Sequence, residues 1–141
     1  MTKIPLSQYP KSSTFLKLKP DPVIPSIQAA KQLYESQNQE EITKLFNKPR
    51  TLKSGAYQFT VPEKRPSYKH LLSSPKALEF LSLPSDSPSD PYYTSIVTGE
   101  SFYNDEKIWP YAQAYAGFQF GQFAGQLGDR RVSNLFTLET P

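Results

Sequence analysis

The chain lacks cysteine and has only one histidine and six glycines among its 141 residues. Without cysteine there are no disulfides, thiolate metal sites or cysteine nucleophiles, and a single histidine excludes a multi-histidine metal site within the chain. No apolar run approaches the roughly 20 residues that span a bilayer, and the N-terminus lacks the apolar stretch of a secretory signal. These absences remove most familiar catalytic constellations and predict a protein without a membrane span.

Charge and composition limit the remaining classes. The 16 Lys and Arg are offset by 13 Asp and Glu, for a net charge of +3, which is too small to demand a nucleic-acid partner. The 14 prolines are roughly twice the average usage, so much of the chain is expected to be extended or turning. The 9 Tyr, 9 Phe and 1 Trp argue against disorder, because disordered chains are poor in aromatics. The length fits a single domain.

Residues 1–25 are predicted to form an extended arm, because they contain five prolines, and proline disfavours helix both at its own position and at the one before it. Residues 1–19 also hold four lysines and no acid, which is part of the bias of a mitochondrial transit peptide. They have no arginine, and Pro5 and Pro10 would interrupt the amphipathic helix of such a peptide. An arm that wraps the domain, an arm that extends freely from it, and a transit segment all stay open.

The middle of the chain predicts short elements of both kinds. Apolar spacing from Ser26 to Pro49 indicates one helix, broken near 36–38. Residues 56–61 alternate aromatic or branched residues with Gln and Thr, the period of a strand covered on one face. Ser74 and Pro75 are typical of a helix start, and Pro84 must end that helix and open a loop to residue 91. The predicted fold class is α+β.

Glycines and aromatics are interleaved near the end of the chain. Four of the six glycines fall at positions 117, 121, 125 and 128, and eight of the 19 aromatics lie between Phe102 and Phe123. The four-residue spacing matches close helix contacts in membranes, but Gln119, Gln122 and Gln126 make a lipid-buried helix improbable.

Residues 125–131 instead indicate a short turn that could bind an anion, followed by an alternating strand from Val132 to Leu138. Backbone N–H groups near glycine can approach phosphate oxygens, and an arginine fork can bind two of them. A tight β-turn with solvated arginines explains the same residues, and neither the P-loop nor the GxGxxG pattern is present. Both interpretations stay open on the pattern alone.

Other candidate residues favour structural roles. His70 has no second histidine or cysteine nearby, and Asp86 and Asp90 lie in a loop where aspartate usually makes local turns. Lys64-Arg65 and Lys48-Pro49-Arg50 are short basic clusters that are typical of solvated surface. Trp109 is expected in the core or as a lid on the glycine segment.

Residues 111–129, YAQAYAGFQFGQFAGQLGD, resemble the signature of the selenoprotein O family, which commonly is YxGHQFGxxAGQLGDGR. Weaker similarity in the family's order extends upstream through 18–22, 49–62 and 74–83, so the likeness covers most of the chain. Phe118, in place of the common histidine, and the preceding Trp109-Pro-Tyr-Ala-Gln113 are most similar to the fungal branch.

The resemblance implies a protein-kinase-like fold that binds ATP with Mg²⁺ and transfers AMP to Ser, Thr or Tyr hydroxyls of protein substrates. Eukaryotic members are mitochondrial. In the family the GDGR turn contacts the nucleotide, which carries over to Gly128 and Arg131 here. Arg130 stands where the family has its second glycine. A side chain there could crowd the phosphates, and it costs about 1 kcal/mol or more if the backbone needs a positive φ.

The catalytic Lys, Asp and Asn of the family have no match in these 141 residues, so no catalytic or metal-binding residue is assigned within the chain. The expected organisation is an arm over 1–25 and a truncated, partial kinase-like N-lobe over 26–141. Such a fragment is expected to be inactive alone and to bind nucleotide weakly or not at all, since transfer needs metal and cations around the triphosphate. The alternatives are a noncatalytic protein-interaction module, whose exposed apolar surface would favour self-association, and a degenerate remnant of the family.

Overall fold

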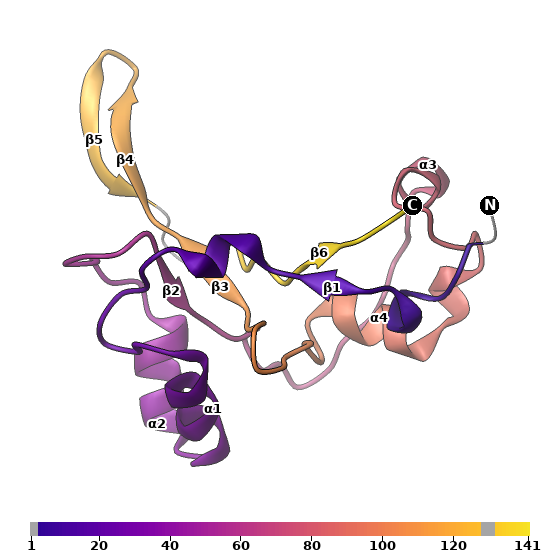
Figure 1. Cartoon of the computed structure of the whole chain (residues 1–141), viewed down its shortest axis with the longest axis horizontal. Coiled ribbons are helices and arrows are strands. Elements are labelled where there is room, and N and C mark those ends of the chain that lie inside the picture. Colours follow the sequence, from indigo (N-terminus) through magenta and orange to yellow (C-terminus); the bar gives the residue numbers. More distant parts are fainter. Residues whose placement is uncertain (1–2, 128–131) are drawn as a thin grey trace.

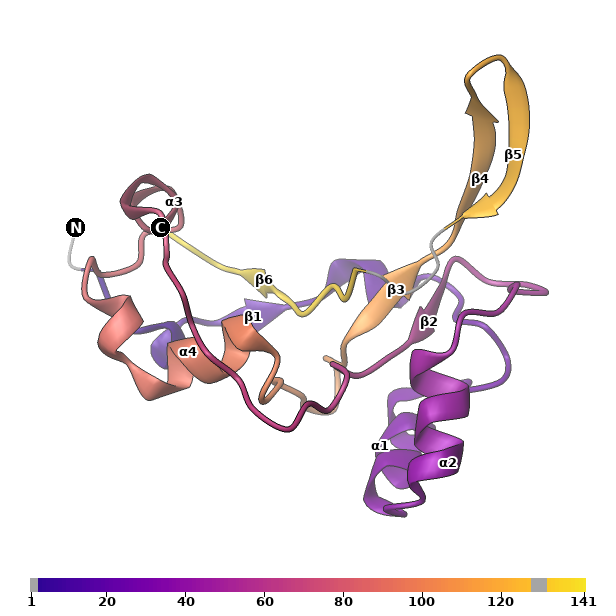
Figure 2. The same cartoon turned by 180° about the vertical axis from the view of Figure 1, so that it is seen from behind.

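The computed structural model describes residues 3–127 and 132–141. It confirms a mixed α+β chain of short helices and three two-stranded antiparallel sheets. The elements spread along an elongated body: α1, α2 and β2–β3 lie toward one end, and α3 and α4 lie toward the other (Figures 1 and 2). Two buried clusters correspond to these two ends.

The N-terminal arm extends from one end of the body to the other. It contains the 3-10 helices Leu6–Gln8 and Thr14–Lys17, with the short strand β1 (Lys11–Ser12) between them. β1 pairs with β6 (Thr137–Leu138), so the arm and the last described strand lie side by side. Leu6 and Tyr9 are buried in one cluster, and Ile24 is buried in the other. The arm is therefore part of the packed structure.

The helix expected between Ser26 and Pro49 is confirmed with its break. α1 (Ile27–Glu35) begins at Ser26, whose side chain accepts a hydrogen bond from the Ala29 amide. α2 (Gln39–Ile42) begins the same way at Asn38 and continues into a π-helical turn, Thr43–Asn47. Asn and Ser are preferred at this position because their side chains satisfy free N–H groups. Gln37 between the helices has a φ of 55°, which ends the first helix and lets the second fold back beside it.

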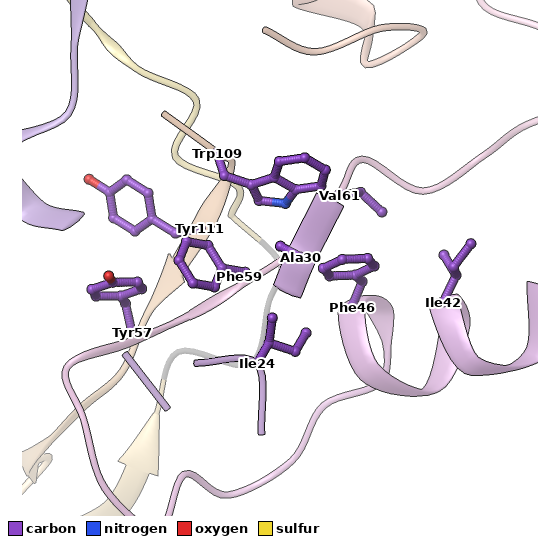
Figure 3. Packing of buried hydrophobic residues seen from close by; sticks show 9 residues of the cluster. All are labelled: Ile24, Ala30, Ile42, Phe46, Tyr57, Phe59, Val61, Trp109 and Tyr111. Carbon is purple, nitrogen blue, oxygen red and sulfur yellow. The ribbon is translucent and has the colours of Figure 1, made fainter. Parts of the chain in front are cut away.

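A small sheet carries the first cluster (Figure 3). β2 (Tyr57–Phe59) pairs with β3 (Tyr111–Gln113), with Gln58 opposite Ala112. Trp109 is in the core as expected, and its indole N–H donates to the Thr60 carbonyl at 3.0 Å. The Thr60 hydroxyl in turn donates to the Phe46 carbonyl at 2.8 Å. The cluster comprises Ile24, Ala30, Ile42, Phe46, Tyr57, Phe59, Val61, Trp109 and Tyr111.

The expectation that one face of strand 56–61 is open to solvent is wrong. Gln58 and Thr60 are as buried as their aromatic neighbours. The helical segment covers Thr60, because its hydroxyl donates to the Phe46 carbonyl of the π-helical turn at 2.8 Å. Contacts between segments so distant in sequence leave no mark on the local alternation of side chains.

The second cluster is built from α3, α4 and the arm. α3 (Pro75–Phe80) begins at Ser74 as expected and ends before Pro84. The expected loop up to residue 91 contains a 3-10 helix, Ser87–Ser89, and leads directly into α4 (Pro91–Thr98), which the sequence reasoning missed. The cluster comprises Leu6, Tyr9, Leu78, Leu83, Tyr93 and Ile96.

The glycine-rich and aromatic segment forms a β-hairpin. β4 (Tyr115–Gln119) pairs with β5 (Gln122–Leu127), and the register shifts between Ala116 and Phe118. The shift leaves one extra residue on β5, where Gly125 has a φ of 76°. A bulge residue in this left-handed region is usually glycine. The hairpin projects away from the rest of the molecule (Figures 1 and 2).

Candidate functional site

The predicted nucleotide turn is centred on Gly128, Arg130 and Arg131, which lie outside the described residues. The structure does describe the strand that leads to it, β5, and the chain from Val132 onward. Each side of the predicted turn is tied to a different part of the body.

Gln126, two residues before Gly128, is fixed by its side chain. Its Oε1 accepts a hydrogen bond from the Leu52 backbone N–H at 2.6 Å, and its Nε2 donates to the Leu52 carbonyl at 3.1 Å. A side-chain amide that pairs with both backbone groups of one residue has a defined orientation. This pair joins the base of the hairpin to the loop that follows the π-helical turn.

Asn134, three residues after Arg131, is fixed through its backbone. Its N–H and carbonyl exchange hydrogen bonds with Tyr111 at 2.8 and 3.0 Å, and its Nδ2 also donates to the Tyr111 carbonyl at 3.2 Å. Tyr111 belongs to β3 and packs in the first cluster. The segment after the predicted turn is therefore anchored on the core sheet.

A buried ion pair lies in the same loop as Leu52. Arg50 Nη1 is 2.9 Å from Asp21 Oδ1, and these side chains are 22% and 2% exposed. Asp21 Oδ1 also accepts a hydrogen bond from the Val23 N–H at 2.9 Å. Among the described residues, Arg50 Nε and Nη2 are buried without a hydrogen-bond partner. Arg50 is thus not the solvated surface residue expected from its basic cluster, because the arm brings a carboxylate to it from 29 positions earlier in the sequence.

The arm approaches this loop very closely at Gly55. The N–H of Asp21 donates to the Tyr57 carbonyl, and the N–H of Ala56 donates to the Lys19 carbonyl, each at 2.8 Å. A Cβ at Gly55, which has a φ of 91°, would lie 2.6 Å from the Pro20 carbonyl carbon and oxygen. Asp21, Arg50 and Gly55 therefore act together to lock the arm against the loop that holds Gln126. Sequence reasoning missed Asp21, since no local pattern marks its distant partner.

His70 lies in a hydrogen-bonded row of side chains beside a cavity. Its Nε2 is 2.8 Å from Ser73 Oγ, which is 2.8 Å from the Tyr93 hydroxyl. The cavity, about 520 Å³, is lined by these residues and by Leu71, Leu72 and Val97 among others. No carboxylate in this lining orients the imidazole, so the row is not a catalytic triad. It connects the 67–73 segment to α4.

The two loop aspartates make local turns, as expected. Asp90 caps α4, with its Oδ1 accepting a hydrogen bond from the Tyr92 N–H at 2.9 Å. Asp86 precedes the 3-10 helix Ser87–Ser89. The Arg65 guanidinium of the other basic cluster pairs with Glu63 at the surface, where both side chains are about 60% exposed.

The arm carries one charged group in an unusual position. The Lys11 ammonium donates to the Leu6 and Tyr9 carbonyls, each at 3.0 Å, and lies 5.0 to 5.8 Å from the centroids of three aromatic rings. These rings belong to Tyr92, Tyr103 and Phe136. Burial lowers the pKa of Lys11 below its usual value. Lys11 thereby links the arm to both α4 and the chain that leads into β6.

The described residues do not fit a magnesium site. Within 3–127 and 132–141, no three His, Asp or Glu side chains gather closely enough to hold a metal ion. The same part of the chain has no helix long and apolar enough to cross a membrane. Contacts to ATP from Gly128 and Arg131 stay a prediction.

A family model described as "Protein adenylyltransferase SelO" matches residues 41–140, which include the core sheet, the hairpin and the predicted nucleotide turn. The chain belongs to this family. The match agrees with the resemblance carried by residues 111–129. Most of that SelO signature forms the hairpin β4–β5, so its evenly spaced glycines do not mark a helix.

The curated relatives come from fungi and bacteria. The chain is 42% identical over 126 residues to "Protein adenylyltransferase SelO, mitochondrial" of Saccharomyces cerevisiae, covering 87% of this chain and 18% of that protein. It is 33% identical over 138 residues to the protein of the same name in Schizosaccharomyces pombe, covering 96% of this chain and 23% of that protein. A "Protein nucleotidyltransferase YdiU" of Flavobacterium johnsoniae is 30% identical over 95 residues, covering 67% of this chain and 18% of that protein.

The chain thus spans about a fifth of the length of these SelO relatives. No solved structure matches it.

Proposed function

We propose that this chain is the N-terminal part of a SelO protein adenylyltransferase that transfers AMP from ATP to Ser, Thr or Tyr hydroxyls of proteins. The family match over residues 41–140 carries the proposal. Residues 26–141 would form part of a kinase-like N-lobe, with residues 1–25 as its arm. The remaining catalytic groups would come from the regions of the longer relatives that the match does not cover.

Within this proposal, Gly128 and Arg131 contact the phosphates of ATP. Gly128 would allow backbone N–H groups to approach phosphate oxygens, and Arg131 would neutralise charge on them. The two anchors support this role: Gln126 on Leu52 and Asn134 on Tyr111 fix the chain on either side of the predicted turn. A nucleotide-binding loop needs such fixed ends, because a ligand contact must repay the entropy of ordering the residues that make it.

This chain alone is expected to be inactive. The family's catalytic Lys, Asp and Asn have no match in it, and its described residues contain no cluster of three His, Asp or Glu side chains that could hold a metal ion. Incubation with α-labelled ATP and acceptor proteins should transfer no label to protein. Label transfer that the Arg131→Ala variant abolishes would contradict this part of the proposal.

The nucleotide role of Arg131 is tested in a chimera in which residues of this chain replace the matched segment of the Saccharomyces cerevisiae relative. Arg131→Ala should weaken ATP binding by about tenfold or more, because a hydrogen bond to a charged group contributes about 1.5–3 kcal/mol. The measurement is equilibrium binding of ATP, together with AMP transfer to protein.

Arg65→Ala is the matched control, since Arg65 is exposed and paired only with Glu63 in the described structure. It should leave ATP affinity unchanged. Equal ATP affinity of the Arg131→Ala and parent chimeras would remove Arg131 from the site. Arg130→Gly restores the family's glycine and should raise ATP affinity if the side chain crowds the phosphates.

A mitochondrial location is part of the proposal. The two fungal relatives carry "mitochondrial" in their names, and residues 1–19 are basic and free of acid. A C-terminal fluorescent fusion of this chain should co-localise with a mitochondrial matrix marker in yeast, and diffuse cytoplasmic signal would contradict it.

A further inference from the structure

The hairpin β4–β5 exposes its aromatic side chains to solvent. We define the aromatic tip as Phe118, Phe120 and Phe123, which are 78%, 101% and 62% exposed. Residues 111–127 contain no charged side chain. Exposed apolar groups that gather on one projecting element usually mark an interaction site.

The backbone of the tip is also strained. Phe120 has a φ of 53°, a left-handed conformation that costs a non-glycine residue roughly 1–2 kcal/mol. Its side chain is fully exposed, so no packing within the described chain offsets this cost. The hairpin turn accounts for this conformation, because Phe120 and Gly121, with φ of 53° and 81°, are the two central residues between the paired Gln119 and Gln122, and a type I′ turn has a positive φ at both. The turn thereby places an aromatic ring at the outermost point of the hairpin, where Asn-Gly or Asp-Gly is usual.

The hairpin has little support from the body of the molecule. Its base is tied by the Gln126–Leu52 pair and by the N–H of Ala114, which donates to the Ala56 carbonyl at 3.1 Å. Beyond the base, the aromatic contact recorded within the hairpin is Phe118 on Phe123, with ring centroids 5.9 Å apart. Both views show the two strands standing clear of every other element (Figures 1 and 2). An isolated two-stranded hairpin is at best marginally stable in water.

We propose that the aromatic tip packs against the part of a SelO protein that lies outside the segment matched by this chain. The matched segment covers 18% and 23% of the two fungal relatives, so most of each relative is available to bury the hairpin. The hairpin also lies inside the segment that the family model matches. A contact with another part of the same SelO polypeptide therefore fits it better than a partner that only this chain would have.

The composition of the hairpin favours a protein surface over a lipid one. Phe118 pairs with Phe123 across the strands, and the adjacent Gln119 pairs with Gln122, so aromatic and amide side chains point to opposite faces. Amide groups are costly in hydrocarbon but can be satisfied by polar groups of a protein. The uncharged tip also offers no cation to anionic lipid headgroups.

This inference rests on the proposed fragment nature of the chain, but not on its nucleotide site. Its test compares the purified chain with the intact Saccharomyces cerevisiae relative by hydroxyl-radical footprinting and amide hydrogen exchange. In the chain alone, the side chains of the aromatic tip should be readily modified. In the relative, side chains aligned with 118, 120 and 123 should react about tenfold more slowly, and amides of the hairpin should exchange more slowly. Buried Phe46 is the internal reference and should be protected in this chain.

A second measurement uses the chimera described above. Phe118→Ser with Phe123→Ser should leave the unfolding midpoint of the chain alone unchanged, because both rings are exposed, but should lower that of the chimera.

Equal reactivity of the hairpin in the chain and in the relative would overturn the proposal, and so would equal unfolding midpoints of the variant and parent chimeras. A third contradicting result is a hairpin that is protected in the chain alone and loses this protection on dilution. A fourth is a hairpin that is protected in the chain only when phosphatidylcholine–cardiolipin vesicles are present. The third would identify a second copy as the occupant and the fourth a lipid surface. ATP binding is measured in parallel. A protected hairpin in a protein that does not bind ATP would remove the proposed function and leave the docking surface standing.

Discussion

At the scale of single residues, the positions that matter most are those where two backbones approach each other. Gly55 and Gly117 both lie in the segment matched by the family, yet their surroundings differ. A Cβ at Gly55 would collide with the backbone of Pro20, whereas a Cβ at Gly117 would have no atom within 4 Å. The same residue type therefore has a steric role at one position and none at the other.

Gly55→Ala is expected to destabilise the chain by about 2 kcal/mol or more, because the left-handed conformation alone costs about 1–2 kcal/mol and the collision with Pro20 adds to it. Urea unfolding followed by the fluorescence of Trp109 measures the change. Gly117→Ala is the matched control and should shift the midpoint little. Similar shifts for the two variants would show that the close approach to Pro20 does not restrict residue 55.

The hairpin at the same scale shows glycine used as a bulge. Gly125 adopts a positive φ where one extra residue enters β5, and this offset sets which side chains of the two strands face each other. Phe120 adopts a comparable conformation without the freedom of glycine. The two-residue turn between Gln119 and Gln122 requires a positive φ at both of its central positions, so Phe120 adopts it together with Gly121.

At the scale of elements, the arm is held by specific contacts rather than by regular secondary structure. Its two-residue strand β1 pairs with β6, Lys11 lies among three aromatic rings, and Asp21 pairs with Arg50. Leu6 and Tyr9 are buried against α3 and α4. The arm therefore contributes side chains to both buried clusters.

Asp21→Asn is expected to lower the free energy of unfolding by about 2–3 kcal/mol, because it leaves the Arg50 guanidinium without its counter-charge. This is less than the loss for a fully buried pair, since Arg50 is 22% exposed. Urea denaturation at pH 7 measures it. Glu63→Gln breaks an exposed pair with Arg65 and should change stability by less than about 1 kcal/mol. An Asp21→Asn effect no larger than that of the control would mean that the arm does not depend on the ion pair.

At the scale of the whole molecule, three tyrosines with raised pKa values are expected to limit stability at alkaline pH. The pKa of Tyr57 is raised because burial disfavours the phenolate and because the neighbouring Tyr111 adds repulsion. The pKa of Tyr92 is raised by burial and by Asp90, and that of Tyr103 by its hydrogen bond to the Asp105 carboxylate. Three groups therefore hold their protons more tightly in the folded chain than in the unfolded one.

The stability that these groups contribute is fully present below the unfolded tyrosine pKa of about 10 and is lost as pH rises through their folded pKa values. Lys11 acts in the opposite sense, since its folded pKa is lowered and its deprotonation favours the folded state. The free energy of unfolding should accordingly fall between about pH 10 and 12. The Tyr57→Phe substitution removes the hydrogen bond to the Leu16 carbonyl, so the free energy of unfolding of the variant should be about 1 kcal/mol lower at pH 8. Above pH 10 the free energy of unfolding of the variant should fall less steeply than that of the parent. Parallel pH profiles of the two proteins would contradict this origin.

Local signals in the sequence placed several elements correctly. Ser26 and Ser74 were expected to begin helices, and both cap them through their side chains. The same logic would have found α4, whose start at Asp90-Pro91 and end at Gly99 are typical of a helix, had the loop composition not been weighed more heavily.

Only part of the candidate site could be predicted from the sequence. The family signature and its hairpin are contiguous in sequence, so the resemblance could be recognised from residues 111–129. Gln126 belongs to the signature, but its partner Leu52 lies 74 positions earlier, and nothing in the local pattern links them. The ion pair of Asp21 with Arg50 was missed for the same reason.

The sequence by itself determined the α+β class, the starts of α1 and α3, the break near residue 37 and membership of the SelO family. Each depends on chemistry between near neighbours: a cap satisfies N–H groups within one turn, and a signature is a run of adjacent residues. Only the tertiary structure decided that the arm covers β2, that Asp21 neutralises Arg50, and that the side chains of the aromatic tip are largely exposed. These depend on which distant segments share the same buried surface, and the chain folds so as to bury the most apolar area consistent with satisfied polar groups.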